Sequence, residues 1–187
     1  MDCLSQREVL PNGRHELFAA NKWKYLLEAS AAGSLSYILA QRGRLQVRLG
    51  EGGQKPDFYI QQHGDVMPFE LTECDDDQRR RGDEYVHMKA ENLYRRVQHR
   101  DIGHDNFMLR KRLPECVRKK TMKRYQPPRH LCIYINIGWK AFFPLYELPE
   151  LTSRGKDVFR SIWLLWSESA IQTWPRLKYV SAYQQRK

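Results

Sequence analysis

Apolar residues recur at three- and four-residue steps over about residues 21–41, and this spacing predicts an amphipathic helix. The residues that would form its buried stripe are Trp23, Leu26, Leu27, Ala31, Leu35, Ile38 and Leu39. Gly33 is expected to kink this helix or to divide it in two. Residues 45–49 then alternate between apolar and polar side chains, as a half-buried strand does.

Two further strands are predicted over residues 57–61 and 66–73, where apolar and β-branched side chains are frequent. The sequence His63-Gly64-Asp65 between them is typical of a tight turn, so the two strands should form a hairpin. A helix is expected next, over about residues 78–99, because the aspartates that precede it favour a helix N-terminus.

The remaining helices and strand are predicted from one basic segment and two apolar segments. Residues 108–125 predict a basic helix that is interrupted near Pro114 and is stopped by the prolines that follow it. Residues 131–137 are apolar enough to form a central strand of a sheet. Residues 157–174 are expected to form a last helix, because their apolar positions fit a helical stripe.

The resulting order of helix, three strands, helix and strand predicts an α/β fold with a mixed sheet flanked by helices. The length of 187 residues suits a single domain that spans residues 1–187. Its core would cover about residues 20–140, and residues 141–187 would form a helical extension at the C-terminus.

The formal net charge of +10 is distributed unevenly along the chain. Residues 1–78 contain 8 Lys and Arg against 12 Asp and Glu, whereas residues 79–187 contain 24 against 10. A basic half favours a polyanionic partner, and the candidates are nucleic acid, acidic proteins and anionic membrane surfaces.

Other features of the composition favour a cytoplasmic protein that does not bind membranes. No apolar stretch reaches the roughly 18 residues that a membrane helix needs, and the N-terminus lacks the pattern of a secretory signal. The four cysteines are far apart and form no CxxC pair, which argues against a zinc site. They are expected to be buried or incidental thiols.

Two carboxylates stand about a dozen residues apart on the predicted hairpin. Asp57 opens one strand and Glu70 lies within the next, so the two side chains can point at the same place. Mg²⁺ and Mn²⁺ prefer such oxygen ligands, and a bound ion of this kind can activate a water for attack on a phosphate. If they do not share a metal, Asp57 is a turn residue and Glu70 a solvent-facing strand residue.

The stretch Pro56-Asp57 followed by Phe69-Glu70-Leu71-Thr72 resembles the PD-(D/E)xK signature of restriction-endonuclease-like proteins. The resemblance covers about residues 20–140 and implies an α-β-β-β-α-β core, in agreement with the order predicted above. It also implies that Asp57, Glu70 and the carbonyl of Leu71 bind the metal. Glu28 in the first helix would match an additional acidic residue of some members.

One position departs from this signature, because Thr72 stands where the family has a lysine that orients or activates the attacking water. Thr72 lies on the same strand face as Glu70, but its hydroxyl carries no charge. Some members of the family supply this lysine from a neighbouring helix, and Lys89 is the candidate here. Arg80 and Arg81 are alternative cations, and without any of them the enzyme would be weak or inactive.

Clusters of basic residues are candidates for contacts with nucleic-acid phosphates. They comprise Arg79, Arg80 and Arg81, then Arg110, Lys111 and Arg112, and finally Arg118, Lys119 and Lys120. The alternatives are that the first cluster pairs with the neighbouring aspartates and that the others form the solvated face of an amphipathic helix.

The sequence thus leaves several functions open. A Mg²⁺-dependent nuclease comes first, acting on nucleic acid with DNA favoured over RNA. The alternatives are a non-catalytic nucleic-acid-binding module of the same fold and a basic protein-interaction or assembly domain. Whether the chain forms a homodimer is left open as well.

Overall fold

The computed structural model describes residues 23–40, 45–50, 55–75, 102–123, 125–137, 143–166 and 169–181. The chain divides into two units, one formed by residues 1–27 and 77–99 and the other by residues 28–76 and 100–187. Nearly all of the described residues belong to the second unit, which contains the sheet and the candidate site.

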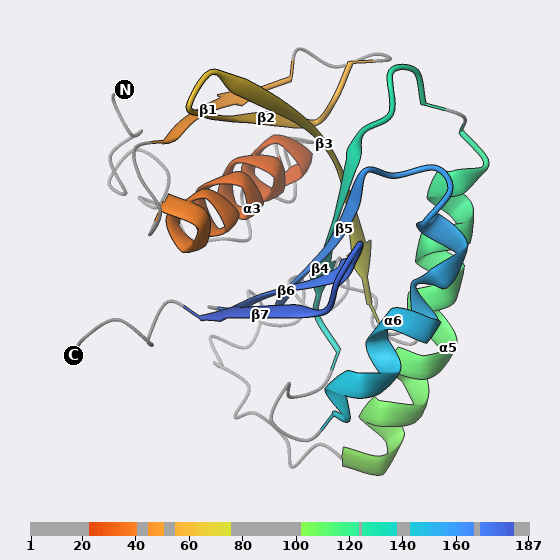
Figure 1. Cartoon of the computed structure of the whole chain (residues 1–187). Helices are drawn as coiled ribbons and strands as arrows, with labels where there is room; N and C mark the ends of the chain where they lie inside the picture. The colour runs from red at the N-terminus through yellow and green to blue at the C-terminus, as the bar shows by residue number, and fades with distance from the viewer. Residues whose placement is uncertain are drawn as a thin grey trace. The chain divides into compact units, whose positions relative to one another are not determined.

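The second unit is built on one mixed sheet of seven strands that are ordered as they occur in the chain. The strands are β1 (Leu45–Leu49), β2 (Phe58–Gln62), β3 (Asp65–Cys74), β4 (His130–Ile135), β5 (Ser161–Trp166), β6 (Ser169–Trp174) and β7 (Lys178–Ser181). The pairs β1–β2, β2–β3, β5–β6 and β6–β7 are antiparallel, whereas the central pairs β3–β4 and β4–β5 are parallel. Figure 1 shows this arrangement. The chain therefore has an α/β fold, as predicted.

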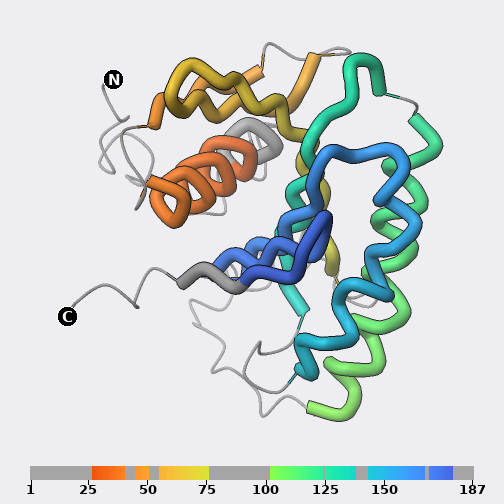
Figure 2. Tube along the Cα trace, in the orientation of Figure 1, coloured from red at the N-terminus to blue at the C-terminus, as the bar shows by residue number. Residues whose placement is uncertain are grey.

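Helices cover both sides of the sheet (Figures 1 and 2). The part of α3 (Trp23–Leu39) that belongs to the second unit, residues 28–39, lies on one side. Helix α5 (Ile102–Thr121) lies on the other and forms the crossover from β3 to the parallel strand β4. The short helices η3 (Leu145–Glu147), α6 (Leu148–Leu151) and η4 (Ser153–Gly155) lead from β4 towards β5 on the α5 side. None of the described helices is both long and apolar enough to cross a membrane.

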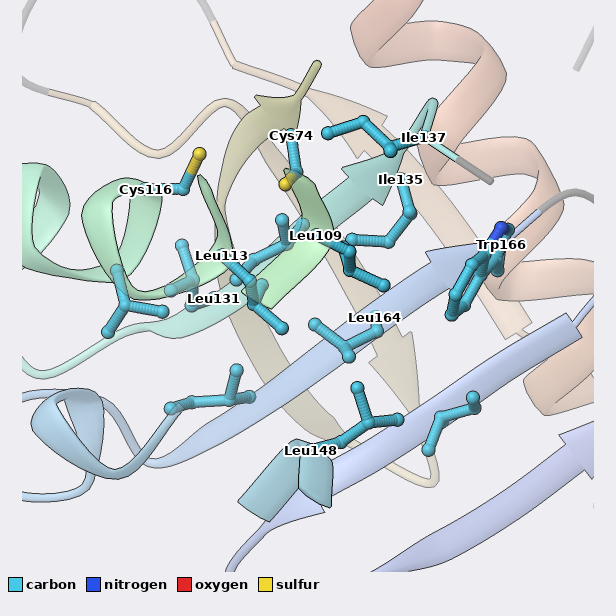
Figure 3. Packing of buried hydrophobic residues seen from close by; sticks show 14 of the residues in the cluster. Cys74, Leu109, Leu113, Cys116, Leu131, Ile135, Ile137, Leu148, Leu164 and Trp166 are labelled. Carbon is cyan, nitrogen blue, oxygen red and sulfur yellow. The ribbon is translucent and has the colours of Figure 1, made fainter. Parts of the chain in front are cut away.

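The core on the α5 side is formed by aliphatic residues of the helix and of the central strands. Leu109 and Leu113 of α5 are fully buried, as are Leu131 of β4 and Leu164 of β5. These side chains gather between helix and sheet in Figure 3. Burial at three- to four-residue steps along the helix and at alternate positions along the strands is what fixes the register between them.

The other side of the sheet has its own apolar layer. Phe58 of β2 and Phe69 of β3 are paired in register and fully buried, and their rings stack with centroids 4.9 Å apart. Leu35 and Ile38 of α3 are also buried. Because side chains alternate along a strand, the neighbours of these two phenylalanines must point to the α5 side.

Several predictions for individual elements are confirmed. The helix over residues 21–41 is present as α3, but Gly33 does not divide it in two, because α3 runs through Gly33 as one element. The hairpin of β2 and β3 is confirmed, and its turn places His63 and Gly64 at positive φ values of 50° and 91°. The predicted helix over residues 78–99 lies outside the described residues.

Two other predictions are wrong. Pro114 does not interrupt the basic helix, because α5 continues through it. Residues 157–174 do not form a helix, since they contain β5 and β6, so the C-terminal region extends the sheet. All six residues of β5 are buried, and such a strand carries a continuous apolar run whose spacing also fits a helix.

Candidate functional site

Asp57 and Glu70 lie on the same face of the sheet. Asp57 directly precedes Phe58, and Glu70 directly follows Phe69, its partner in the β2–β3 register. Because both phenylalanines point to the α3 side, both carboxylates point to the α5 side. Thr72, two residues further along β3, shares this face. The hairpin therefore brings the two predicted carboxylates together.

Hydrogen bonds to the backbone of β3 hold Asp57 in place just before the start of β2. Its N–H donates to the carbonyl of Phe69 at 2.9 Å, and its Oδ2 accepts the N–H of Leu71 at 2.7 Å. In an extended strand the N–H and C=O of one residue point to the same side. The carbonyl of Leu71 therefore faces the Asp57 side, as the predicted third metal ligand should.

The cation in this site is Lys120, from the last turn of α5. Its Nζ is 3.2 Å from Oε2 of Glu70 and 3.8 Å from Oδ2 of Asp57. Both carboxylates thus converge on one ammonium group. Lys120 had been predicted as a phosphate contact, whereas Lys89, the predicted lysine of the site, lies outside the described residues.

The sequence contains an indication that Lys120 points to the sheet. Leu109, Leu113 and Val117 form the buried stripe of α5 at four-residue steps. Lys120 comes three residues after Val117, so it lies on the same face of the helix and points to the sheet. A lysine that continues an apolar stripe must find a buried partner, and the carboxylates of the hairpin provide one.

Arg129 is a second cation of the site, and it was not predicted. It immediately precedes β4 and forms a buried ion pair with Oε1 of Glu70. Its guanidinium carbon lies 4.9 Å from the ring centroid of Tyr125. Burial and the charges of Glu70 and Asp57 raise the pKa of Tyr125 above its ordinary value, so its hydroxyl stays protonated.

The four charged side chains form a compact, largely buried and electrically balanced group, which we call the carboxylate cluster. It consists of Asp57, Glu70, Lys120 and Arg129, whose side chains are 14%, 6%, 13% and 8% exposed. At these exposures solvent screens the charges weakly, so each cation strongly affects what the carboxylates can bind.

The oxygens of this cluster fit a hard divalent cation. Two carboxylates and the Leu71 carbonyl would supply part of its ligand shell, and Mg²⁺ keeps several waters in such sites. These are oxygen donors, which Mg²⁺ and Mn²⁺ prefer over the nitrogen and sulfur donors typical of zinc sites. Among the described residues no group of three or more His, Cys, Asp and Glu is placed to hold a metal.

The other predicted binding residues differ in their surroundings. Arg110 donates to both carboxylate oxygens of Glu147, at 2.7 and 3.0 Å, and Arg112 donates to Glu115 at 2.7 Å. Both arginines thus pair with carboxylates of the protein, although Arg110 itself is exposed. Lys111, Arg118 and Lys119 of α5 are also exposed. Glu28 is buried in α3, and Arg79, Arg80 and Arg81 lie outside the described residues.

A second polar cluster lies on the opposite face of the sheet. Nδ1 of His130 is 2.6 Å from Oγ of Ser161, and Nε1 of Trp163 donates to the same Oγ at 2.7 Å. Burial, with a smaller contribution from Arg160, lowers the pKa of His130 to about 4. The imidazole is therefore neutral at pH 7, and we call this group the histidine cluster.

Comparisons with family models, curated proteins and solved structures found no match to this chain.

Proposed function

We propose that this protein is a Mg²⁺- or Mn²⁺-dependent nuclease that hydrolyses phosphodiester bonds of nucleic acid at the carboxylate cluster. The observation that carries the proposal is the convergence of Asp57 and Glu70 on the Nζ of Lys120. Two acidic oxygen donors beside a largely buried ammonium group are the parts that metal-assisted phosphodiester hydrolysis requires.

The fold that we propose is the restriction-endonuclease-like one. The order α3, β1, β2, β3, α5, β4 supports it, with an antiparallel β1–β2–β3 and a parallel β3–β4 pair. In this interpretation Lys120, from the crossover helix, takes the place of the lysine that the signature lacks at Thr72.

Each residue of the cluster has a distinct role in this proposal. Asp57, Glu70 and the Leu71 carbonyl would hold the divalent cation, which lowers the pKa of a bound water and offsets charge on the phosphate. Lys120 orients the attacking water or binds a phosphate oxygen as negative charge develops there. Arg129 holds Glu70 in place through Oε1, and Tyr125 packs beneath its guanidinium.

The charge balance of the cluster predicts how substrate and metal bind. Two carboxylates are matched by Lys120 and Arg129, so a divalent cation adds two uncompensated positive charges. A phosphodiester and a hydroxide carry the opposite charge, and we expect each to strengthen the binding of the cation. Exposed Arg118 and Lys119, beside Lys120 on α5, favour a polyanionic substrate such as DNA.

The proposal is tested by cleavage of plasmid and single-stranded DNA with Mg²⁺ or Mn²⁺. The wild-type protein should cleave at least one substrate, EDTA should stop the reaction, and Asp57→Asn and Glu70→Gln should abolish it. Cleavage that survives both substitutions would refute the proposed site. The same substitutions leave side-chain volumes nearly unchanged, so thermal unfolding can show that the variants are folded.

A second function is favoured by the ion pairs of Glu70, since each of its carboxylate oxygens already contacts a cation. If these pairs are permanent, the cluster is structural and the protein is a non-catalytic nucleic-acid-binding module. Salt-sensitive DNA binding by the wild-type protein, with no cleavage in any metal ion, would establish this alternative.

A further inference from the structure

A pair of side chains lies beside the carboxylate cluster on the same sheet face. Tyr59 is two residues after Asp57, so the two side chains point the same way, about 7 Å apart along the strand. Arg48 of β1 is the register partner of Tyr59. Its guanidinium carbon lies over the tyrosine ring, 4.6 Å from the centroid. We call this pair the Arg48–Tyr59 shelf.

The shelf is open to solvent. Arg48, Gln46 and Gln61 are exposed on this face, whereas Phe58 and Ile60, which point to the other face, are fully buried. Helix α5 packs on β3 and on the η4 turn. The β1–β2 part of this face therefore presents polar side chains to the surroundings, directly next to the cluster.

The chemistry of the shelf suits a phosphate. Stacking on Tyr59 uses the flat face of the guanidinium and leaves its N–H groups, which lie in the plane, directed outward. Arg48 makes no ion pair with any residue in the described part of the chain. An arginine that is held by an aromatic ring but retains its donors is prepared for a forked hydrogen bond to phosphate oxygens.

We infer that a nucleic-acid strand with its scissile phosphate at the carboxylate cluster continues across β2 and β1, where Arg48 binds a neighbouring phosphate. The inference rests on the proposed function for the location of the scissile phosphate. The separation of roughly 7 Å between Asp57 and Tyr59 along the chain is comparable to one nucleotide step of an extended nucleic-acid strand. The shelf therefore determines the direction in which the bound strand extends away from the carboxylate cluster.

Binding of fluorescein-labelled oligo(dT) and of a labelled hairpin duplex, followed by anisotropy in EDTA over a range of salt concentrations, tests the inference without turnover. Arg48→Met should weaken binding about tenfold, because a charged hydrogen bond is lost. It should also reduce the slope of log K against log salt by about 0.7 on the single strand or 0.9 on the duplex.

The matched control is Arg176→Met, which removes an exposed arginine from the turn between β6 and β7. It changes the net charge equally but should leave both the affinity and the salt slope close to those of the wild type. Tyr59→Leu should give a smaller loss than Arg48→Met, because the charge stays and only its stacking partner is removed.

The outcomes separate the shelf from the proposed catalysis. Equal effects of Arg48→Met and Arg176→Met on both probes would overturn the shelf, even if the protein is a nuclease. Absence of any binding by the wild-type protein would overturn it too. A selective effect of Arg48→Met in a protein that cleaves nothing would support the shelf and refute the nuclease. The probe with the larger Arg48 effect identifies the preferred strand form.

Discussion

Arg129 and His130 are adjacent in the chain, but they belong to two clusters on opposite faces of the sheet. Arg129 joins the carboxylate cluster through its ion pair with Glu70. His130 joins the histidine cluster through Ser161, whose Oγ also accepts the indole N–H of Trp163. Both clusters are largely buried, and in both a polar group finds a partner from a distant part of the chain.

The two clusters differ in charge. The carboxylate cluster holds four formal charges at one site. The histidine cluster holds none, because burial keeps the imidazole neutral, and its hydrogen bonds tie β4 to β5. Burial of a polar group therefore does not by itself identify a functional site. A concentration of charge that is balanced only by other charges is the stronger indication.

The largest effects are expected from Glu70→Ala. Removing this carboxylate leaves Arg129 buried without its partner, so we expect a loss of about 3–5 kcal/mol in the free energy of unfolding. Cleavage should fall by about 100-fold or more, because a proposed metal ligand is removed. Denaturant unfolding and a DNA cleavage assay measure the two effects.

Ser161→Ala provides the comparison from the other cluster. It removes the partner of His130 and Trp163, and we expect it to cost about 1–3 kcal/mol. It should leave the cleavage rate per folded molecule unchanged. A loss of cleavage equal to that of Glu70→Ala would show that the two clusters do not differ in function as we propose.

The next effect concerns the metal affinity of the free protein. Arg129→Met removes one of the two cations that balance the carboxylates, so Mn²⁺ should bind about tenfold more tightly in the absence of nucleic acid. Calorimetric titration with Mn²⁺ measures this change. Arg160→Met, an exposed arginine that acts on His130 and is outside the carboxylate cluster, should leave the affinity unchanged. Weaker binding in Arg129→Met than in Arg160→Met would contradict the counter-ion role.

A moderate effect should appear in the pH dependence of stability. His130 has a pKa of about 4 in the folded protein, below its ordinary value of 6.5, so the unfolded chain binds more protons between these values. The contribution of His130 to the free energy of unfolding is therefore fully present above pH 6.5. It decreases by roughly 3 kcal/mol as the pH is lowered towards 4.

This pH dependence can be assigned by substitution. His130→Gln should flatten the decrease between pH 6.5 and 4, whereas His63→Asn should retain it. His63 lies in the exposed turn between β2 and β3, and asparagine tolerates its positive φ. Unfolding in urea at a series of pH values measures the slope. An unchanged slope in His130→Gln would show that the histidine cluster does not keep its imidazole neutral.

The smallest effect is expected from Arg110→Ala. Its ion pair with Glu147 lies at the surface, where the hydrogen bond raises the pKa of Arg110 and lowers that of Glu147. Surface pairs contribute little to stability, and added salt weakens them. We therefore expect only a small decrease in the free energy of unfolding in urea at low salt, and a smaller one at high salt. A loss as large as that of Glu70→Ala would show that a surface ion pair stabilises this protein as much as the buried pairs of the carboxylate cluster do.

The sequence was sufficient to predict the parts that depend on local patterns. Alternation along the hairpin placed Asp57 and Glu70 on one face, and the His63-Gly64 turn fixed their register. The apolar stripe of α5 indicates that Lys120 faces the sheet, but no local pattern identifies Glu70 as the partner of Lys120 or of Arg129. These contacts span 50 and 59 residues of chain, and they depend on where α5 crosses the sheet and on where β4 begins.

The C-terminal region shows a different limit of prediction from sequence. The apolar run in Ser161–Trp166 fits a helical stripe as well as a strand that is buried on both faces. Only the neighbouring strands β4 and β6 decide between these alternatives, because they supply hydrogen-bond partners on both edges. A strand in the middle of a sheet is therefore harder to predict than an edge strand with one polar face.

The most direct test compares two adjacent lysines of α5. Lys120 contacts both carboxylates, whereas Lys119 is exposed. We predict that Lys120→Met lowers Mg²⁺-dependent cleavage of DNA by about 100-fold or more, while Lys119→Met retains cleavage and weakens binding only slightly. Equal activity of the two variants, or no metal-dependent cleavage by the wild-type protein, would contradict the assignment of the carboxylate cluster as a nuclease site.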